Sequence, residues 1–355
     1  MYFGAHHMNA AHVKTICTRY TKKSPTLPKN SPGLTPHEMR NRPRASGARA
    51  ISHFGGVGGL VPPQKQTQKG KHMFLAFDLG SNSYIASLAD QNGHILWETR
   101  RVVRLGTQLS PDGALYPEAF ERPIEVARAM IDEARAKAAQ YGAPNEILES
   151  RCVATRALRA ASNANAFCGA FARCTGLSLD VITCDEEARL ERLGQTNAPV
   201  ILAHAGQPWL LIDVGGGSTE LSWIDETHQC TWTQSLNIGA LSGSGERVGA
   251  HILQALASHT CAPTRLIVCA GSVFSSYAQH KLGLKDYRAD AVEGARLDDE
   301  PHAMPLDLAS LDDASHVGAH IVRSLQNAHP DTPIYATTRG LRHGLIADFL
   351  AKHTL

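Results

Sequence analysis

The chain contains few aromatic side chains and no long apolar segment. Phe, Trp and Tyr make up 6% of its 355 residues, and no apolar run approaches the roughly 20 residues that a helix needs to cross a bilayer. The N-terminal region also lacks the compact apolar core of a secretory signal. We therefore expect no membrane span and no membrane partner, and the pattern favours a cytoplasmic protein.

Cysteine is present but is not arranged in closely spaced pairs. None of the eight cysteines forms a Cys-x-x-Cys motif, and several, such as Cys152 and Cys269, lie in apolar surroundings. This is typical of reduced thiols in a cytoplasmic protein. His316 and His320 stand four residues apart on an expected helix, a spacing that can bind zinc. No further ligand is in view, so two exposed histidines are favoured.

Acidic residues are nearly absent from the first 72 positions. This segment has twelve Lys and Arg and a single acidic residue, Glu38, so it carries +11, and the net charge of +2 leaves −9 for the rest. Without apolar periodicity it cannot bury enough surface to fold, so residues 1–72 are predicted to be a disordered basic extension. A basic arm can bind nucleic acid or polyphosphate. The favoured interpretation is that it lies outside the folded protein. Met73 stands directly before the first expected strand and is a candidate translation start.

The same segment contains a glycine-rich run at 54–59. No strand precedes this run and no helix follows it, so it is not predicted to be a phosphate-binding loop. With the basic arm set aside, no specific nucleic-acid partner is expected.

The remainder has mixed α and β patterning. Two short strands are expected at 74–79 and 83–89 around a tight turn. The residues that follow are spaced 4-3-4-3-4, which predicts an amphipathic helix: Phe120, Ile124, Ala127, Ile131, Ala134 and Ala138. A strand near 151–154, a helix near 162–174 and a helix opening at Asp185 complete this half.

The second half begins in the same way. Strands are expected at 209–214, 219–224 and 266–270, and a helix near 341–352, while the run 243–245 is interpreted as a loop. The segment 77–83 can be laid over 212–218, 135 residues further on, with its Asp, Gly and Ser coinciding. Such a repeat predicts two similar α/β domains facing across a cleft, here assigned to 73–190 and 191–355.

Each copy of the repeat is an aspartate at a strand end, a glycine turn and a hydroxyl residue. The backbone N–H groups of such a turn can converge on phosphate oxygens, and the aspartates, Asp78 and Asp213, can hold Mg²⁺. The alternative is a pair of ordinary hairpins, but two matching copies favour a site. Where the second copy has Glu220, the first has Ile85. Packing gives little reason for the residue at position 220 to be acidic. The alternative is that Glu220 is simply an exposed residue of a strand.

The acidic run 185–187 admits a structural explanation. Asp185 can cap the free N–H groups of a helix, and acids in a first turn suit the helix dipole. From these residues alone, capping is favoured.

Five motifs occur in a fixed order: Asp78–Ser83, Ala154–Arg159, Glu186–Arg189, Ile212–Glu220 and Gly340–Gly344. Together they resemble the exopolyphosphatase/guanosine pentaphosphate phosphohydrolase family, in its short two-domain form, over about residues 74–350. The resemblance implies two ribonuclease-H-like domains of the actin-like ATPase superfamily around an interdomain cleft.

The resemblance also implies roles for individual residues. Glu187 would be the general base, and Glu220 would hold and polarise the attacking water beside Mg²⁺. Asp213 would be the main metal carboxylate, with Asp78 facing it. Arg159 would bind the phosphate chain. Substrate would also be bound by the two turns, which comprise Gly80, Ser81, Asn82 and Ser83 in the first copy and Gly215, Gly216, Gly217, Ser218 and Thr219 in the second.

Two positions depart from the family pattern. The family usually has a basic residue or histidine after the aromatic of the first motif, but Ile85 follows Tyr84 here. The family's Ser-Gly-Thr turn of the second domain is reduced to Gly271-Ser272, without the Thr. Both departures fall near the expected path of the phosphate chain, so they bear on substrate placement more than on the catalytic assignment.

The favoured function is that of an exopolyphosphatase, a phosphoric anhydride hydrolase that removes the terminal phosphate of inorganic polyphosphate with Mg²⁺, or Mn²⁺, as cofactor. The first alternative is hydrolysis of guanosine pentaphosphate (pppGpp) to ppGpp, and the second, of another class, is an inactive phosphate- or nucleotide-binding regulator. A kinase rests on fold analogy alone. The expected partner is polyphosphate or guanosine pentaphosphate, and a homodimer is left open.

Overall fold

The computed structural model describes residues 72–142, 148–259, 264–299 and 313–353. The predicted extension lies outside this part except for its last residue, and so does the glycine-rich run 54–59. Within the described residues no helix is both long and apolar enough to cross a membrane. The six cysteines that are described are free thiols, and Cys152 and Cys269 are buried, as their apolar surroundings predicted.

The described strands form two five-stranded sheets with the same topology. The first has the order β3-β2-β1-β4-β5 and the second has β8-β7-β6-β9-β10 when read in the same direction. In each, the first hairpin is antiparallel and the later strands join in parallel. The strands are β1 (Met73–Leu79), β2 (Ser83–Asp90), β3 (Ile95–Val102), β4 (Leu148–Ala154), β5 (Leu179–Val181), β6 (Trp209–Val214), β7 (Thr219–Ile224), β8 (Cys230–Leu236), β9 (Leu266–Ala270) and β10 (Ile334–Ala336). The repeat read from two seven-residue segments therefore extends over whole sheets.

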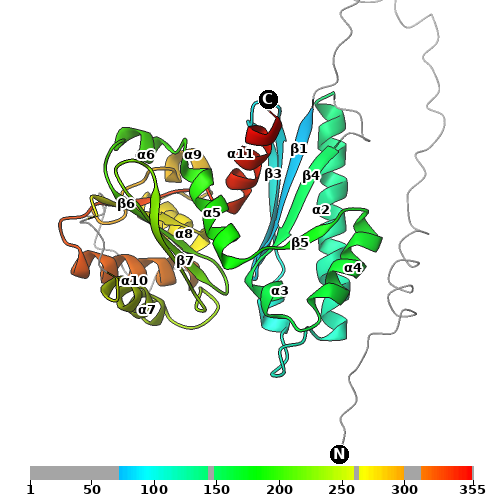
Figure 1. Cartoon of the computed structure of the whole chain (residues 1–355), viewed down its shortest axis with the longest axis horizontal. Helices are drawn as coiled ribbons and strands as arrows, with labels where there is room; N and C mark the ends of the chain where they lie inside the picture. The colour runs from blue at the N-terminus through cyan, green and yellow to red at the C-terminus, as the bar shows by residue number, and fades with distance from the viewer. Residues whose placement is uncertain (1–71, 143–147, 260–263, 300–312, 354–355) are drawn as a thin grey trace, which may run out of the picture.

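Helices cover both sheets. They are α2 (Glu121–Gln140), α3 (Arg156–Ala160), α4 (Ala164–Thr175), α5 (Cys184–Gln195), α6 (Pro199–Ala203), α7 (Gly245–Ala257), α8 (Ser272–Lys281), α9 (Ala289–Val292), α10 (Asp313–Ala328) and α11 (Leu341–His353), with short 3-10 turns at Leu105–Gln108 and Pro117–Phe120. Figure 1 shows α5 and α11 in the middle of the molecule, with α2 and α4 outside one sheet and α7 and α10 outside the other. The middle helices are thus the ones that face the space between the sheets.

Successive side chains of each central strand point to opposite sides of its sheet, and this divides each half of the molecule into two apolar layers. Leu75, Phe77 and Leu79 of β1 point into the core beneath α2 and α4, whereas Phe74 and Ala76 pack against α5 and α11. Successive side chains of a strand face opposite sides. Asp78 therefore lies on the inner side, in line with Phe74 and Ala76.

The second half repeats this arrangement. Leu210, Ile212 and Val214 of β6 point into the core beneath α7, α8 and α10. Trp209 and Leu211 pack on the opposite side with α6. Asp213 lies on the same side of the sheet as Trp209 and Leu211. Each aspartate therefore lies near the end of a central strand, and its side chain points away from the larger helical layer.

The strands and helices expected from the sequence are present, with two corrections at helix ends. Helix α5 is capped by Thr183, whose hydroxyl accepts a hydrogen bond from the Glu186 N–H, and not by Asp185. Because Thr183 takes the capping position, Asp185 and Glu187 are left free for other roles. The run 243–245 is not wholly loop, since Ser244 caps α7 and Gly245 is its first residue.

The C-terminal helix returns to the first half of the chain. Leu341, Leu345 and Ile346 of α11 pack with Phe74 and Val153 of the first sheet. The proposed division into 73–190 and 191–355 stays a prediction. It falls within α5, and it assigns to the second segment a helix that covers the first sheet.

Helices α5 and α11 approach each other through glycine. A Cβ built on Gly344 would lie 1.8 Å from the Leu190 carbonyl oxygen, and one built on Gly194 would lie 2.8 Å from the Gly340 carbonyl oxygen. Neither helix backbone could come so close if a side chain intervened. The position of α5 therefore depends on these two glycines.

We predict that Gly344→Ala lowers the free energy of unfolding by about 1–3 kcal/mol or more, because the added methyl forces α11 away from α5. Gly169→Ala is a matched control within helix α4, where the nearest atom to an added Cβ is the flexible end of Arg173 at 3.3 Å. Its higher helix propensity makes that change neutral or stabilising by up to about 1 kcal/mol. Urea unfolding measures both variants, and equal losses would contradict the close-contact explanation.

Candidate active site

A cavity of about 530 Å³ lies where the two halves meet. The first half contributes Asp78, the turn 80–83, and Glu98, Thr99 and Arg100 of β3; α5 contributes Glu187 and Glu191; the second half contributes Asp213, the turn 215–218, Glu220, and the segment 337–342 that leads into α11. Few of the lining side chains are apolar. The cavity therefore suits a charged and strongly hydrated ligand better than an apolar one.

The two repeated turns face each other across this cavity. A Cβ on Gly216 would lie 2.8 Å from the Asn82 Cβ, and one on Gly217 would lie 3.0 Å from the Ser81 hydroxyl oxygen. Glycine is required at these places because the turns of the two halves touch. The sequence predicted both turns as substrate-binding elements, and the structure brings them together.

Strand register explains why the two copies differ in one acidic residue. Asp213 stands directly across the hairpin from Glu220, and Asp78 stands directly across from Ile85. Residues paired in this way have side chains on the same side of the sheet. The second sheet thus presents two neighbouring carboxylates to the cavity, and the first presents one.

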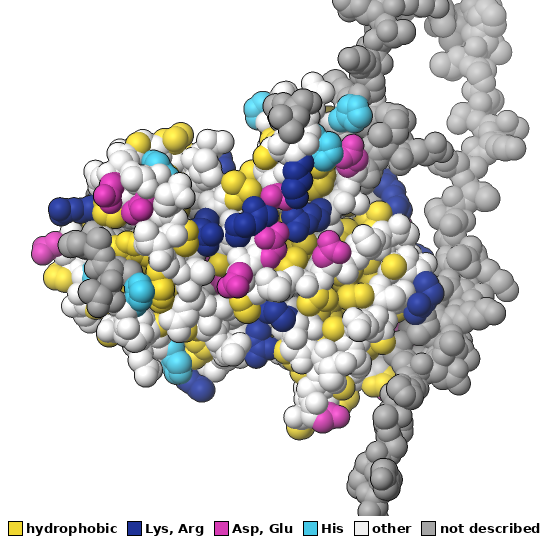
Figure 2. Space-filling view, viewed as in Figure 1, with side chains coloured by type: hydrophobic (Ala, Val, Ile, Leu, Met, Phe, Trp, Pro, Cys, Tyr) yellow, Lys and Arg dark blue, Asp and Glu magenta, His cyan; other side chains and the backbone are white. Residues whose placement is uncertain are grey.

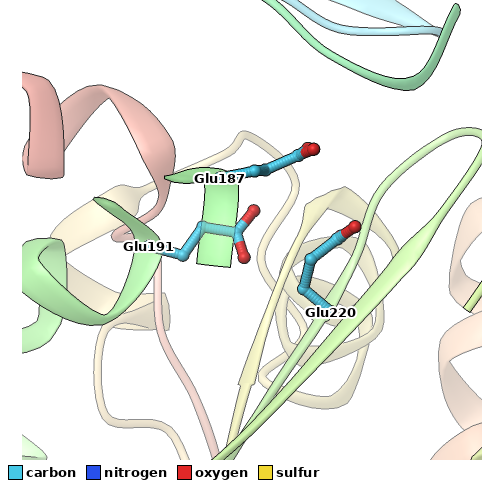
Figure 3. Close-up of side chains that lie close together, drawn as sticks. All are labelled: Glu187, Glu191 and Glu220. Atoms are coloured by element: carbon cyan, nitrogen blue, oxygen red, sulfur yellow. The ribbon is translucent and has the colours of Figure 1, made fainter. Parts of the chain in front are cut away.

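Helix α5 adds two further carboxylates. Oxygen atoms of Glu187, Glu191 and Glu220 all lie within 4.8 Å of one another, and all three residues are buried. Figure 3 shows the Glu187 and Glu191 side chains extending from one helix and Glu220 from a strand, all toward a common space. Glu191 was not predicted from the sequence. The sequence did hold a signal for it, because Glu191 stands four residues after Glu187 and residues four apart share one face of a helix.

Asp78, Asp213, Glu191 and Glu220 hold their protons unusually strongly. Burial, followed by repulsion from Glu187, raises the pKa of Asp78 and of Asp213 to about 7. Burial also raises the pKa of Glu191 and of Glu220 well above the usual range, with further contributions from neighbouring carboxylates. Such shifts mark a concentration of negative charge that lacks a compensating cation.

Two buried oxygens point to what would compensate that charge. Oδ1 of Asp78 and Oε2 of Glu191 have no hydrogen-bond partner among the described residues. Carboxylate oxygens are the ligands that hard divalent cations prefer. The acidic cluster fits such an ion, with Glu187, Glu191 and Glu220 closest together. Asp78 and Asp213, which were predicted to be metal ligands with Glu220, line the same cavity but lie outside this tightest group.

Glu187 is held by an arginine. Nη1 of Arg159 donates to Oε2 of Glu187 at 2.7 Å and to the Ile182 carbonyl oxygen at 3.0 Å. Burial raises the pKa of the Glu187 carboxyl, and Arg159 opposes that increase. One oxygen of Glu187 is thus fixed by an ion pair, and the other is left to accept a further hydrogen bond.

Two of the predicted site residues do not line the cavity. Arg159, predicted to bind the phosphate chain, is directed at Glu187. Thr219 is buried, and its hydroxyl donates to the Ile238 carbonyl oxygen at 2.7 Å. The other predicted residues all line the cavity: Asp78, Gly80, Ser81, Asn82, Ser83, Glu187, Asp213, Gly215, Gly216, Gly217, Ser218 and Glu220.

Glu186 has a structural role that separates it from Glu187. It accepts hydrogen bonds from Arg151 and Arg189, and both arginines also contact Asp348 of α11. Basic and acidic side chains gather over the middle of the face shown in Figure 2. The network joins α5, β4 and α11, so Glu186 helps to fix the helix that carries Glu187.

The His316 and His320 pair is not as isolated as the sequence suggested. Both lie on α10, and Nδ1 of His320 is 3.0 Å from a carboxylate oxygen of Glu246 at the start of α7. His316 is exposed, as predicted, and His320 is half-buried. Among the described residues, the group whose ligand atoms meet within 4.8 Å is the glutamate cluster and not these histidines.

The sequence of residues 84–244 matches the model of the Ppx/GppA phosphatase family. This match confirms the predicted resemblance to that family. The matched segment includes Glu187, Asp213, Glu220 and the second glycine turn, all of which line the cavity. With the family, the predicted enzyme class of a phosphatase is confirmed.

Solved structures of Ppx/GppA proteins have the same fold. A family member from Aquifex aeolicus is 21% identical, with a TM-score of 0.62 over 80% of this chain and 99% of its own. An exopolyphosphatase-like protein is 24% identical, with a TM-score of 0.64 over 81% and 100%. An exopolyphosphatase from Cytophaga hutchinsonii is 16% identical, with a TM-score of 0.58 over 79% and 98%. This likeness confirms the predicted α/β fold, which in this chain is built on two mixed β-sheets with helices.

The two departures from the Ppx/GppA pattern both fall on the cavity wall. Ile85 and the Gly271-Ser272 turn are among its lining residues. Gly271 has a φ of 108°, and a Cβ there would lie 2.4 Å from the Val214 carbonyl oxygen. Glycine is therefore required at this turn although the Thr is missing, and Ser272 supplies a hydroxyl beside it.

The raised pKa values generate a prediction about pH. Asp78 and Asp213 bind protons more strongly in the folded than in the unfolded state, so their stabilising contribution is complete below about pH 4 and is lost as the pH rises to about 7. In the presence of a chelator, each lowers the free energy of unfolding by at most about 1.4 kcal/mol per pH unit in this window. Asp78→Asn and Asp213→Asn should each make the free energy of unfolding depend less steeply on pH. Urea unfolding from pH 5 to pH 8 measures this, and slopes unchanged from the wild-type protein would contradict it.

Proposed function

We propose that this protein is an exopolyphosphatase that hydrolyses the terminal phosphate of inorganic polyphosphate in a reaction that depends on a divalent metal ion, Mg²⁺ or Mn²⁺. One observation carries the proposal. A cluster of buried carboxylates and two opposed glycine turns line the same polar cavity. Phosphoryl transfer to water requires positioning and charge neutralisation more than covalent catalysis, and this cavity offers both.

A divalent cation held by the cavity carboxylates other than Glu187 would neutralise charge on the phosphate that is cleaved. Glu187 would then act as the general base. Its Oε2 is fixed by Arg159, which leaves Oε1 to accept a proton from the attacking water. Glu220 accepts a hydrogen bond from the Ser235 hydroxyl at 2.9 Å, and this contact orients its carboxylate toward the same water.

The two turns would bind the phosphate oxygens. Exposed backbone N–H groups in glycine turns form cradles for anions, and here one cradle comes from each half of the molecule. Because Gly216 and Asn82 are in contact, both cradles can act on one phosphate group. Arg159 acts in this proposal as a positioning residue for Glu187, in place of the direct phosphate contact predicted from the sequence.

A second candidate is hydrolysis of pppGpp, and one observation favours it. Tyr287 lines the cavity, and 53% of its surface is exposed. An exposed aromatic ring can stack on a nucleobase, an interaction that contributes about 1–3 kcal/mol. Polyphosphate has no base and gains nothing from this ring.

A phosphate-release assay on polyphosphate and on pppGpp, each with Mg²⁺ and with Mn²⁺, tests the proposal. Faster release from polyphosphate supports the exopolyphosphatase. Faster release from pppGpp, reduced by Tyr287→Ala, supports the nucleotide enzyme. Release from neither substrate, together with binding of either, would establish a regulator that lacks catalytic activity.

We predict that Glu187→Gln lowers turnover by roughly 10²–10⁴-fold while folding is preserved, because glutamine keeps the shape of the side chain and removes its basicity. Asp185→Asn is the matched control. Asp185 is an exposed acid in the same first turn of α5, and its carboxylate has no hydrogen-bond partner among the described residues. Glu186 would be a poorer control because it bonds two arginines. Equal turnover of the Glu187 and Asp185 variants would reduce Glu187 to a helix-dipole residue.

A further inference from the structure

Corresponding rows across the two sheets carry different charges. In the second sheet the row is Ser235, Glu220 and Asp213. In the first sheet the same row is Arg100, Ile85 and Asp78. Side chains of one row share a side of the sheet, and Arg100, Ile85 and Asp78 all line the cavity. Where the second half has a serine and a glutamate, the first half therefore presents a guanidinium.

Arg100 makes no direct ion pair with a described acidic side chain, although the Asp78 carboxylate attracts it from a longer distance. Its Nη2 donates to the Ser83 hydroxyl at 2.9 Å, and no carboxylate of the described residues lies within the 4.0 Å of an ion pair. Ser83 belongs to the first glycine turn. The guanidinium is thus fixed beside a predicted phosphate-binding element by a neutral hydrogen bond, and most of its five N–H donors stay available to a ligand.

A second arginine faces it from the other end of the chain. Arg342, the second residue of α11, lines the same cavity and lies close enough to Arg100 for the two charges to repel. It donates to Glu98 at 2.5 Å and to the Thr338 carbonyl oxygen at 2.9 Å. Glu98 is fixed in turn by the Ser87 hydroxyl at 2.6 Å. Glu98 offsets one of the two positive charges, so one remains.

We propose that Arg100 and Arg342 form a second anion subsite, which binds the phosphate groups of the chain that follow the one being cleaved. The proposal deepens the proposed function and rests on it for the identity of the ligand. Glu98 pairs directly with Arg342 alone, so a further anion would be attracted to the two guanidinium groups, and phosphate is the anion that matches their planar donors.

The position of the subsite fits a chain longer than one phosphate. The Arg100 backbone stands two strands, or about 10 Å, from that of Asp78 in the sheet. The glutamate cluster lies on α5 and the second sheet. Its Glu187 is bonded by Arg159, which also bonds the carbonyl of Ile182 directly after β5, and β5 lies on the side of β1 opposite β3. A phosphate chain that ends at the cluster and runs past the turn 80–83 would therefore place its later groups beside Arg100.

Arg101→Ala is a matched control for Arg100→Ala in the full-length protein. Arg101 is the next residue of the same strand and carries the same charge, but it points to the opposite side, where it pairs with Glu133 at 3.1 Å. Binding of tripolyphosphate is measured by calorimetry in the presence of a chelator, which prevents turnover. Arg100→Ala should raise the Kd by about 10- to 100-fold, as expected for loss of a charge-assisted contact, and Arg101→Ala by less than about twofold.

Kinetics on polyphosphate provide the second measurement. Arg100→Ala should raise KM by a similar factor and change kcat by less than about threefold, because Arg100 lies away from the reacting atoms. Equal Kd values for the Arg100 and Arg101 variants would overturn the subsite. A wild-type protein that binds tripolyphosphate through Arg100 but releases no phosphate from any substrate would overturn the proposed function and leave the subsite in place.

Discussion

Glu187, Glu191 and Glu220 bring carboxylate oxygens within 4.8 Å of one another in a buried region, and Asp78 and Asp213 add to this charge from two different sheets. Without a cation, these groups can coexist only by retaining protons, which is the physical content of their raised pKa values. Arg159 offsets part of the charge at Glu187. The packing of α5, the ion pairs around it and the glycine contacts with α11 all serve to hold this unfavourable arrangement in one geometry.

The duplicated fold explains how such an arrangement can arise. Two copies of one sheet bring equivalent strand ends together, so any residue placed after the central strand is presented twice to the same space. The copies then diverge at a few positions of one row, with Glu220 and Ser235 in the second and Ile85 and Arg100 in the first. One half of the cavity is thereby acidic and suited to a metal ion, and the other carries the positive charge that an anionic substrate requires.

Much of this was predictable from the sequence, and the exceptions have physical causes. The central strands and the buried face of α2 were found because their apolar spacing is regular. Strands β5 and β10 have only three residues, too few for a periodic pattern, and β3 is largely exposed, so its polar residues conceal it. Glu191 was missed because acidic residues on a helix are usually solvated, and only the approach of β7 shows that this one is buried. Arg100 was missed because strand register, and not distance along the chain, places it beside Ile85.

Helix α11 covers the face of the first sheet formed by Phe74 and Ala76, although its first residue, Leu341, comes 160 positions after Val181, the end of that sheet's last strand (341 − 181 = 160). During synthesis this apolar face must wait for nearly the whole chain before it acquires its cover, and contacts so distant in sequence slow folding. The segment 337–342 reaches the cavity on the same return path. A ribosome-bound first half therefore has neither a complete core nor a complete cavity, and the cavity is complete only when α11 has docked.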